Sequence, residues 1–402
     1  MLAWTSYDVA SSTYIGVVPT VLFPIFYLTV VNTGAAGLLS WGVGVSVALL
    51  VAGLAAPFIG KVADRDQSRW HFLVITTLLC CAATAALALV QPGQSVLALV
   101  AFALAQAAYS LSQPLYESYL PMLARAADSG RVSAFGWAIG FMGGIMIIVV
   151  LLPVASHASG HALFAESFML VGLLFAIIAG PALWFLRRVV EGERTDRVQP
   201  ERPSIWQTVR QWRLNRELFK VIVAFYMVNS AMVTISVFAA EYFRSSFGAS
   251  VHELLVLMLV YTVIALPATF VFGVLGDRWT HGSAILVSLS IWAGAVVLMA
   301  LGTATWVPMV VVVLLGLVYG STQALFRSLI ALWVPRGREA EFFGFNAAAG
   351  RISASVGPVL YGVIATTTGD SRMALLSMIF FVVAGAGILT VTADPLRKAS
   401  LL

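Results

Sequence analysis

Charged residues are scarce in this chain. Only 10% of its 402 residues are Asp, Glu, Lys or Arg, whereas 60% are hydrophobic. A soluble domain carries about 25% charged residues, and the mean hydropathy of +0.95 is far above the soluble range. The composition therefore excludes a soluble globular protein and indicates that lipid surrounds most of the chain. The net charge of +5 does not indicate nucleic-acid binding, because the basic residues separate apolar runs and form no known binding module.

Cysteine is nearly absent. Cys80 and Cys81 are adjacent within one apolar run, which excludes a disulfide framework and argues against a metal site. No basic segment precedes the first apolar run, so we expect no cleavable signal peptide.

Enzyme signatures are also missing. The three lysines lie outside any Walker A loop, and His252 lacks the second histidine of an H-E-x-x-H motif. The glycines at 385–387 lack the rest of a dinucleotide fingerprint. His157 and His161 are i, i+4 in a predicted outer connection, where a solvated loop explains them better than a metal. We expect no enzyme, no cofactor and no metal.

The apolar runs are long and continuous, which favours membrane-spanning helices over a β-barrel. We predict an all-α membrane protein with twelve transmembrane helices, at 5–31, 36–59, 71–90, 95–121, 133–155, 166–187, 218–243, 251–275, 283–302, 305–333, 343–366 and 372–392.

Basic residues predict the orientation of these helices. With the N-terminus inside, 19 of the 23 Lys and Arg fall in even-numbered connections or the C-terminal tail. This asymmetry predicts cytoplasmic termini. Short connections favour a prokaryotic inner membrane, with an organelle membrane as the alternative.

The longest connection, 188–217, lies at the midpoint and is polar and basic. We predict an N-terminal six-helix bundle at 1–187, a cytoplasmic linker at 188–217 and a C-terminal six-helix bundle at 218–402. Within the linker, apolar and basic residues alternate after Ser204. This pattern predicts an amphipathic helix on the inner leaflet, or alternatively a partner-docking segment.

The two predicted bundles share short motifs in the same order, which indicates a duplicated chain. The matches are 60–65 with 273–278, both reading G-x-x-x-D-R; 109–118 with 319–328; and 135–137 with 343–345.

Twelve helices with G-x-x-x-D-R after the second and the eighth resemble the major facilitator superfamily. The segment Trp4 to Ser12 resembles the opening of its vacuole-effluxer-like branch, W-x-x-Y-D-x-A-x-S. Further matches to this branch are Gly130–Trp137, Gln323–Ser328, Arg338–Gly344 and Gly350-Arg351.

The resemblance implies a major facilitator fold with two pseudo-symmetric bundles and secondary active transport by alternating access. The expected solute is a small polar or charged organic molecule, such as an amino acid, peptide or organic acid. The other expected partners are a coupling proton and the lipid bilayer. We expect the protein to be a monomer. The alternatives are a membrane scaffold or sensor that transports nothing, and a lipid flippase with the same fold.

Polar residues lie along one face of the fourth and of the tenth predicted helix, namely Tyr109, Gln113 and Glu117, and Tyr319, Gln323 and Arg327. In the resembled fold these helices line the central cavity. We predict that Glu117 and Arg327 face one aqueous path, where they bind solute or alternate between pairing and release. A structural ion pair and solvated positions near the cytoplasmic mouth are the alternatives. Glu117 replaces an amide expected in the branch, which would alter the solute or the coupling ion.

Other polar groups are candidates for the same path. Asp8 lies near the inner end of the first helix, where it has a solute or gating role or is an interfacial acid. Tyr226 and Asn229 on the seventh helix either line the cavity or form helix–helix hydrogen bonds.

The two G-x-x-x-D-R motifs indicate gating. An Asp just beyond a helix end can accept hydrogen bonds from the N-terminal amides of a neighbouring helix. The resemblance implies that Asp64 meets the eleventh helix and Asp277 the fifth. Arg65, Arg278 and Arg351 complete the predicted gating set, with an ordinary charged turn as the alternative. Pro19 and Pro24 in the first helix, Pro114 in the fourth and Pro267 in the eighth predict hinges.

Overall fold

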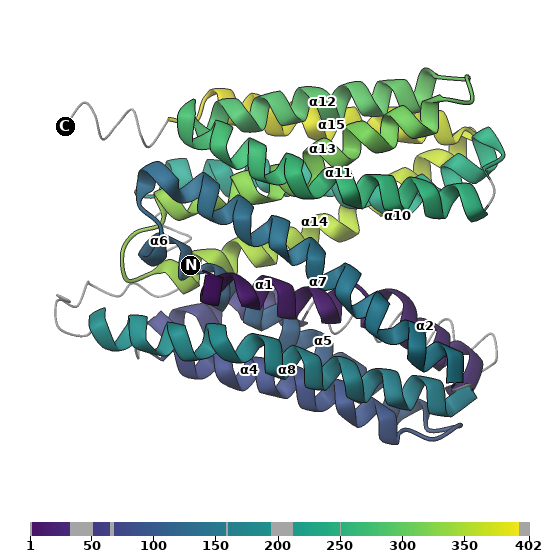
Figure 1. Cartoon of the computed structure of the whole chain (residues 1–402). Helices are drawn as coiled ribbons and strands as arrows, with labels where there is room; N and C mark the ends of the chain where they lie inside the picture. The colour runs from purple at the N-terminus through teal and green to yellow at the C-terminus, as the bar shows by residue number, and fades with distance from the viewer. Residues whose placement is uncertain are drawn as a thin grey trace. The chain divides into compact units, whose positions relative to one another are not determined.

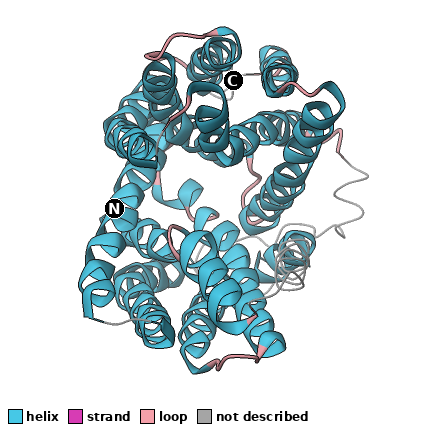
Figure 2. Ribbon diagram, turned by 90° about the vertical axis from the view of Figure 1, so that its right-hand side faces the viewer, coloured by secondary structure: helices cyan, strands magenta, loops and turns pink. Residues whose placement is uncertain are grey.

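The computed structural model describes residues 2–32, 51–64, 68–157, 160–193, 212–249 and 251–393. Regular structure in these residues is helical, with no strand, as Figure 2 shows. Eleven of these helices are long and apolar enough to cross a membrane. The predicted span 36–59 begins outside the described residues. Its last part, 51–59, is described and belongs to a helix at 51–64. The predicted linker helix after Ser204 lies outside the described residues.

The longer helices follow the predicted spans to within about six residues, because each hydrophobic run dictates the helix that crosses the bilayer. They are α4 (Arg69–Ala86), α5 (Ser95–Glu117), α7 (Ser129–His157), α8 (Gly160–Glu193), α10 (Arg216–Phe247), α11 (Val251–Arg278), α12 (His281–Leu301), α13 (Val307–Trp333), α14 (Glu339–Thr368) and α15 (Ser371–Thr390).

The largest difference concerns α8, which extends beyond the predicted 166–187 at both ends. Hydropathy marks only the apolar part of a helix, and polar end turns stay helical once the backbone hydrogen bonds continue. His161 therefore belongs to α8, and its Nε2 donates to the carbonyl of Val90 at 2.7 Å. The expectation of a solvated loop at His161 is wrong.

The first predicted span is not one regular helix. It consists of α1 (Leu2–Ile15), a π-turn η1 (Val18–Leu22), α2 (Phe23–Phe26) and a second π-turn η2 (Tyr27–Val31). Pro19 lies in η1 and Pro24 in α2. A proline cannot donate to the preceding turn, so the backbone changes its hydrogen-bond register at these positions. Their role as hinges remains a prediction.

The fourth span ends earlier than predicted. After α5 a turn at 118–119 separates it from the short helix α6 (Leu120–Leu123). Pro121 is the cause we infer, because it lacks the N–H that would continue α5 and suits the first turn of a new helix. Glu117 is consequently the last residue of α5.

The chain forms two compact units. The first contains residues 1–119, 139–205 and 336–347, and the second contains 120–138, 206–335 and 348–402. Each unit thus includes a short segment from the opposite half of the sequence. The predicted contiguous bundles at 1–187 and 218–402 do not include this exchange, and their boundaries remain a prediction.

The packing pattern inside the first unit recurs inside the second. In the first, α1 packs on α8, and α4 packs on both α5 and α8 (Figure 1). In the second, α10 packs on α15, and α12 packs on both α13 and α15. In each half, the first span packs on the sixth, and the third span packs on the fourth and on the sixth. The repeat seen in the sequence is therefore also a repeat of helix packing.

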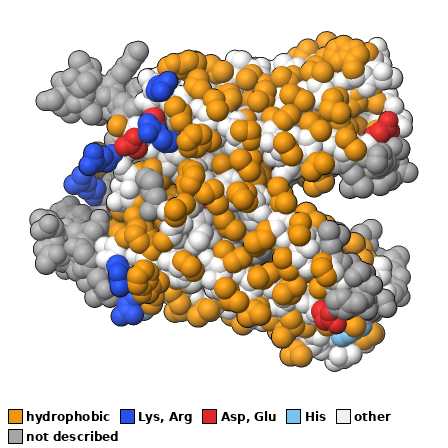
Figure 3. Space-filling view, in the orientation of Figure 1, with side chains coloured by type: hydrophobic (Ala, Val, Ile, Leu, Met, Phe, Trp, Pro, Cys, Tyr) orange, Lys and Arg blue, Asp and Glu red, His pale blue; other side chains and the backbone are white. Residues whose placement is uncertain are grey.

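The surface is that of a protein solvated by lipid. Large apolar side chains stand exposed on the helices, such as Leu54 at 63% and Phe380 at 65%. On the face shown in Figure 3, hydrophobic side chains cover most of the visible surface, and the visible Lys and Arg lie toward one end of the helices. This arrangement agrees with the basic inner connections predicted from the sequence.

Candidate functional site

A buried carboxylate in the first unit caps the N-terminus of α14. Asp64 accepts hydrogen bonds from the backbone N–H groups of Ala340, at 3.2 Å, and Glu341, at 2.9 Å. These amides lie in the first turn of α14, where the helix dipole favours an anion. The contact of Asp64 with the eleventh span, expected from the resemblance, is therefore present. Its gating role remains a prediction.

Arg69, the first residue of α4, completes this cluster. Its Nε donates to Asp64 Oδ1 at 2.6 Å, and its Nη2 donates to Glu339 Oε2. The three side chains are at most 6% exposed. Burial raises the pKa of the Asp64 carboxyl to about 6, although Arg69 and the N–H of Glu341 act in the opposite direction. We call Asp64, Arg69, Glu339 and the first amides of α14 the first cap cluster.

The glycine of the motif makes this contact possible. Gly60 and Asp64 are i, i+4 in the helix at 51–64, so both lie on the face that meets α14. A Cβ on Gly60 would lie 2.1 Å from the backbone oxygen of Ala340. The expectation that Asp64 lies beyond a helix end is wrong, because the motif continues the helix. In the spacing G-x-x-x-D, the glycine lets the backbone of α14 come close, and the aspartate one turn later reaches the amides at its N-terminus.

The second unit repeats the arrangement at the N-terminus of α7. Asp277 Oδ1 accepts from the N–H of Gly130 at 2.7 Å, and its Oδ2 accepts from the N–H of Arg131 at 2.8 Å. A Cβ on Gly273, four residues earlier, would lie 2.2 Å from Ala134 Cβ. The expected contact of Asp277 with the fifth span is present, and Asp277 too lies inside its helix, α11.

The side chains around Asp277 differ from those around Asp64. His281, the first residue of α12, places Nε2 3.7 Å from Asp277 Oδ1 and 3.3 Å from Ser129 Oγ. The guanidinium of Arg131 is 3.8 Å from Asp277 and 51% exposed. We call Asp277, His281, Ser129 and the first amides of α7 the second cap cluster.

The other predicted gating residues are only partly placed. Arg65 lies outside the described residues, and Arg278 is exposed at the end of α11. Arg351 is half-buried on α14 and belongs to the second unit, whereas Asp64 belongs to the first. Its predicted place beside Asp64 stays a prediction.

Asp8 lies in a buried aromatic cluster of the first unit. Its Oδ2 accepts a hydrogen bond from the hydroxyl of Tyr116 at 2.7 Å, and its side chain is almost fully buried. The ring of Tyr116 stacks on Trp4 and on Tyr7, with centroids 4.9 and 4.5 Å apart. Tyr7 in turn shares a hydrogen bond with Thr77 on α4 at 2.7 Å. The cluster ties α1 to α5 and α4 around one carboxylate.

The predicted polar face of α5 is half-buried to buried. Tyr109 packs its ring 5.1 Å from that of Tyr14, whose hydroxyl donates to Gln106 at 3.0 Å. The Nε2 of Gln113 is buried and has no hydrogen-bond partner within the described part of the chain. Glu117 is half-buried at the C-terminal end of the helix.

In the second unit, Asn229 and Gln323 are joined. The Nε2 of Gln323 donates to Asn229 Oδ1 at 3.0 Å, and the Nδ2 of Asn229 donates to Ser353 Oγ at 2.7 Å and to the carbonyl of Gly350 at 3.2 Å. This network links α10, α13 and α14, which is the helix–helix alternative left open by the sequence. Asn229 therefore uses its amide oxygen and its amide nitrogen to hold helices together.

The remaining predicted residues of the second unit lie on the same two helices. Tyr226 is half-buried on α10, one turn before Asn229 and Ser230. Tyr319 on α13 is surrounded by aromatic rings, with centroids 6.1 Å from Tyr261 and 6.3 Å from Trp292.

Arg327 is buried and held by the first turns of α7. Its Nε donates to Ser133 Oγ at 2.8 Å, its Nη2 donates to the Ser133 carbonyl, and its Cζ lies 6.0 Å from the centre of the Trp137 ring. Ser133 Oγ also donates to the carbonyl of Ala324. Ser133 and the Trp137 ring thus fix the orientation of the guanidinium at the start of α7.

Sequence reasoning missed four residues of these sites: Arg69, Glu339, His281 and Ser133. Arg69 is one of the basic residues of the predicted inner connections, and Glu339 and Ser133 lie within the motifs 338–344 and 130–137. The available signal was position, because Arg69, His281 and Glu339 each open a helix next to a motif aspartate or its partner amides.

Comparisons with known proteins agree with this arrangement. A model of the family described as "Vacuole effluxer Atg22 like" matches residues 41–398. The chain is 27% identical over 399 residues to the "Uncharacterized MFS-type transporter YxiO" of Bacillus subtilis (strain 168), which covers 96% of this chain and 93% of that protein.

Solved structures share the fold at low identity. A bacterial homologue of the iron transporter ferroportin in the outward-facing state superposes with a TM-score of 0.76 at 15% identity, covering 97% of each chain. The major facilitator superfamily transporter FucP in the outward conformation gives a TM-score of 0.74 at 12% identity, again over 97% of each chain. The chain therefore belongs to the vacuole-effluxer Atg22-like family and is a multi-pass membrane protein with the major facilitator fold of a secondary transporter.

Proposed function

We propose that this transporter moves a small polar or charged organic solute by alternating access. We place it in a prokaryotic plasma membrane, as a monomer with cytoplasmic termini. The observation that carries the proposal is the pair of cap clusters. In each, a carboxylate from one half of the sequence holds a helix N-terminus from the other half, through contacts of about 3 Å. Such contacts can close a path on the cytoplasmic side and release it when they separate.

The polar faces of α5 and α13 supply the chemistry for the solute. Arg327 presents a planar fork that can hold a carboxylate or phosphate with two hydrogen bonds. Glu117 supplies the opposite charge, and the amide of Gln113 supplies a donor with no partner among the described residues. A zwitterionic or anionic solute is the class that these groups fit best.

Proton coupling is the proposed source of energy. Glu117 is the first candidate, and Asp8 is the second. The hydroxyl of Tyr116 on α5 donates to Asp8 on α1 at 2.7 Å, so a proton taken up by this carboxylate would change a contact between the two helices.

Uptake into proteoliposomes tests the proposal. We expect an inward proton gradient to drive uptake of at least one solute from a panel of amino acids, dipeptides and organic acids. Arg327→Gln should abolish that uptake, and Glu117→Gln should abolish substrate-driven alkalinisation. Arg188→Gln is the matched control, because Arg188 is exposed near the end of α8 and is not one of the predicted gating residues. No uptake of any solute by protein that melts cooperatively, or unchanged uptake by Arg327→Gln, would reject the proposed function.

A further inference from the structure

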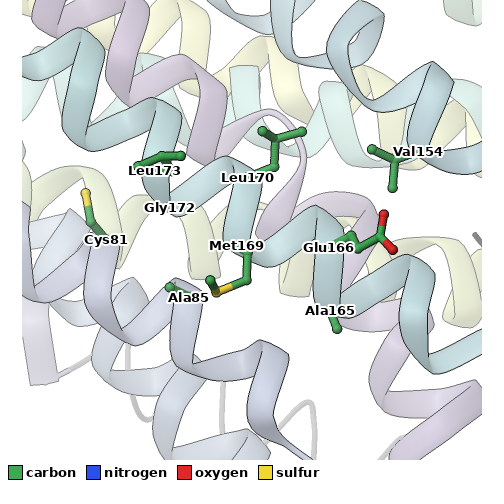
Figure 4. A pocket seen from close by; sticks show the side chains of 9 residues that line it. All are labelled: Cys81, Ala85, Val154, Ala165, Glu166, Met169, Leu170, Gly172 and Leu173. Carbon is green, nitrogen blue, oxygen red and sulfur yellow. The ribbon is translucent and has the colours of Figure 1, made fainter.

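A pocket of about 670 Å³ opens between α4, α7 and α8 in the first unit (Figure 4). Its walls are almost entirely apolar and include Cys81 and Ala85 of α4, Val154 of α7 and Leu173 of α8. Gly172 of α8 lies against α4, since a Cβ there would be 2.8 Å from the Cys81 carbonyl oxygen. The volume falls in the range of small-molecule sites, about 300–1,000 Å³.

Among the described residues that line this pocket, the carboxylate of Glu166 is the one charged group. It is exposed on α8 within the span His161–Val189, and Figure 4 shows it directed toward Val154 and away from Cys81. A carboxylate in a membrane span is costly, and such residues usually have a functional role. No step of solute transport proposed above uses Glu166.

The pocket has a polar end and an apolar end. Glu166 is five residues from the start of the span, roughly 7 Å along the helix, and Gly172 lies about 9 Å deeper at 1.5 Å per residue. The opposite end of α8 carries Arg187 and Arg188, which marks it as the cytoplasmic end. Glu166 therefore lies near the outer surface, with the apolar walls below it toward the bilayer centre.

We propose that this pocket binds a phosphatidylethanolamine lipid of the outer leaflet, with one acyl chain between α4, α7 and α8 and its ammonium group on Glu166. A lipid in the outer leaflet has its headgroup at the outer surface and its acyl chains toward the bilayer centre. The pocket has its carboxylate and its apolar walls in the same order. A chain that moves from bilayer to pocket exchanges one hydrocarbon environment for another, so it contributes little selectivity. The ammonium–carboxylate hydrogen bond must therefore provide the selectivity, and an anionic headgroup is repelled.

Native mass spectrometry of the full chain tests this proposal. The purified protein is exchanged into micelles containing phosphatidylethanolamine, phosphatidylcholine or phosphatidylglycerol with identical acyl chains. Phosphatidylcholine keeps the positive charge but has no N–H donor, and phosphatidylglycerol has neither. We expect the fraction of protein that retains one lipid molecule to be highest for phosphatidylethanolamine, lower for phosphatidylcholine and lowest for phosphatidylglycerol. The affinities for the first two should differ about tenfold, because a hydrogen bond to a charged group contributes about this much.

Two variants locate the effect. Glu166→Gln should remove the preference for phosphatidylethanolamine while leaving the weaker retention of phosphatidylcholine. Ala85→Leu fills the pocket and should lower retention of all three lipids, whereas Ala82→Leu, on an exposed face of α4 outside the pocket, should not.

Three results would overturn the proposal. They are equal retention of the three lipids by the unmodified protein, an unchanged preference in Glu166→Gln, and competition by free ethanolamine at the lipid concentration, which would mean that the acyl chain is not bound. If Ala85→Leu fails to fold, the lipid series and Glu166→Gln still decide the question.

Discussion

The two cap clusters share their backbone geometry and differ in their charges. In both, a glycine lets a helix N-terminus approach, and an aspartate one turn later accepts from two of its amides. The first cluster adds a buried arginine between two carboxylates, whereas the second adds a histidine and a serine. The two halves therefore share the glycine and the hydrogen bonds from backbone amides to the aspartate. They differ in the side chains that surround the aspartate.

This difference has a physical consequence. Arg69 carries a permanent charge, so the first cluster is a buried ion triad that is stable only while all its members are present. His281 can be neutral or charged, and its ring is 3.7 Å from the nearest oxygen of Asp277. The first cluster is therefore the more sensitive to loss of its cation, and the two should be equally sensitive to loss of their glycines.

Removal of the cation should have the largest effect. Arg69→Ala leaves Asp64 and Glu339 as buried like charges, which costs about 3–5 kcal/mol. We expect hydrogen exchange of the Ala340 and Glu341 amides in lipid nanodiscs to become at least about a hundredfold faster. His281→Ala should accelerate exchange of the Gly130 and Arg131 amides much less. An equal response of the two clusters would mean that the charge difference is irrelevant.

The control for this experiment is Arg131→Ala. The Arg131 guanidinium is 51% exposed and 3.8 Å from Asp277, so its loss should cost less than about 1 kcal/mol. The double variant Arg69→Ala with Glu339→Gln should recover part of the lost protection, because it removes one of the two buried charges.

Methyl groups at the two glycines should have a similar effect on both clusters. Gly60→Ala and Gly273→Ala place a Cβ 2.1 and 2.2 Å from the nearest atom of the partner helix. Overpacking of this kind costs about 1–3 kcal/mol, so we expect exchange of the capped amides to accelerate about tenfold in both variants. Gly294→Ala on α12 is the control, because no atom lies within 4 Å of its added Cβ. A response confined to one cluster would show that the shared geometry is not equally important in both.

Acidification should stabilise the first cluster by a smaller amount. The pKa of Asp64 is about 6 when it is buried beside Arg69 and Glu339, against an ordinary 3.8 when exposed. Because the buried value is the higher one, this stabilisation is complete below pH 3.8 and is lost as the pH rises through about 6. Between pH 7 and pH 5 the closed form should gain about tenfold over the open form.

Hydrogen exchange of Ala340 and Glu341, corrected for the intrinsic pH dependence, measures this change. Asp64→Asn should make the corrected exchange independent of pH across the same range. A cluster that opens more readily at pH 5 than at pH 7 would contradict the direction of the Asp64 shift.

The spans and the contact of each motif aspartate were predictable from the sequence. Apolar runs of sufficient length dictate helices in lipid, and the eleven spans within the described residues follow from hydropathy and length. The contacts of Asp64 and Asp277 were predicted from the resemblance, because in the resembled fold the aspartate of each G-x-x-x-D-R motif meets a particular helix.

The partners of Arg69 were not predictable. Glu339 is 270 positions away along the chain, and no local spacing joins an arginine at one helix start to a glutamate at another. The sequence also left two interpretations of Asn229, a cavity-lining group or a helix–helix hydrogen bond, and it did not join Asn229 to Gln323, whose amide donates to it in the structure. The π-turns of the first span were missed because hydropathy does not record a change of hydrogen-bond register. The predicted encounter of Glu117 with Arg327 remains a prediction.

Helices α7 and α14 each belong to both compact units, because the assignment changes after Ala138 in one and after Ala347 in the other. These two helices continue without a break through the change of unit, whereas the change after Tyr119 falls at the turn that follows α5. Gly140 and Gly350 lie two and three residues beyond the changeover. Glycine is the residue at which a helix flexes at the lowest cost. Under the proposed alternating-access function, Gly140 and Gly350 are the positions at which we expect α7 and α14 to bend.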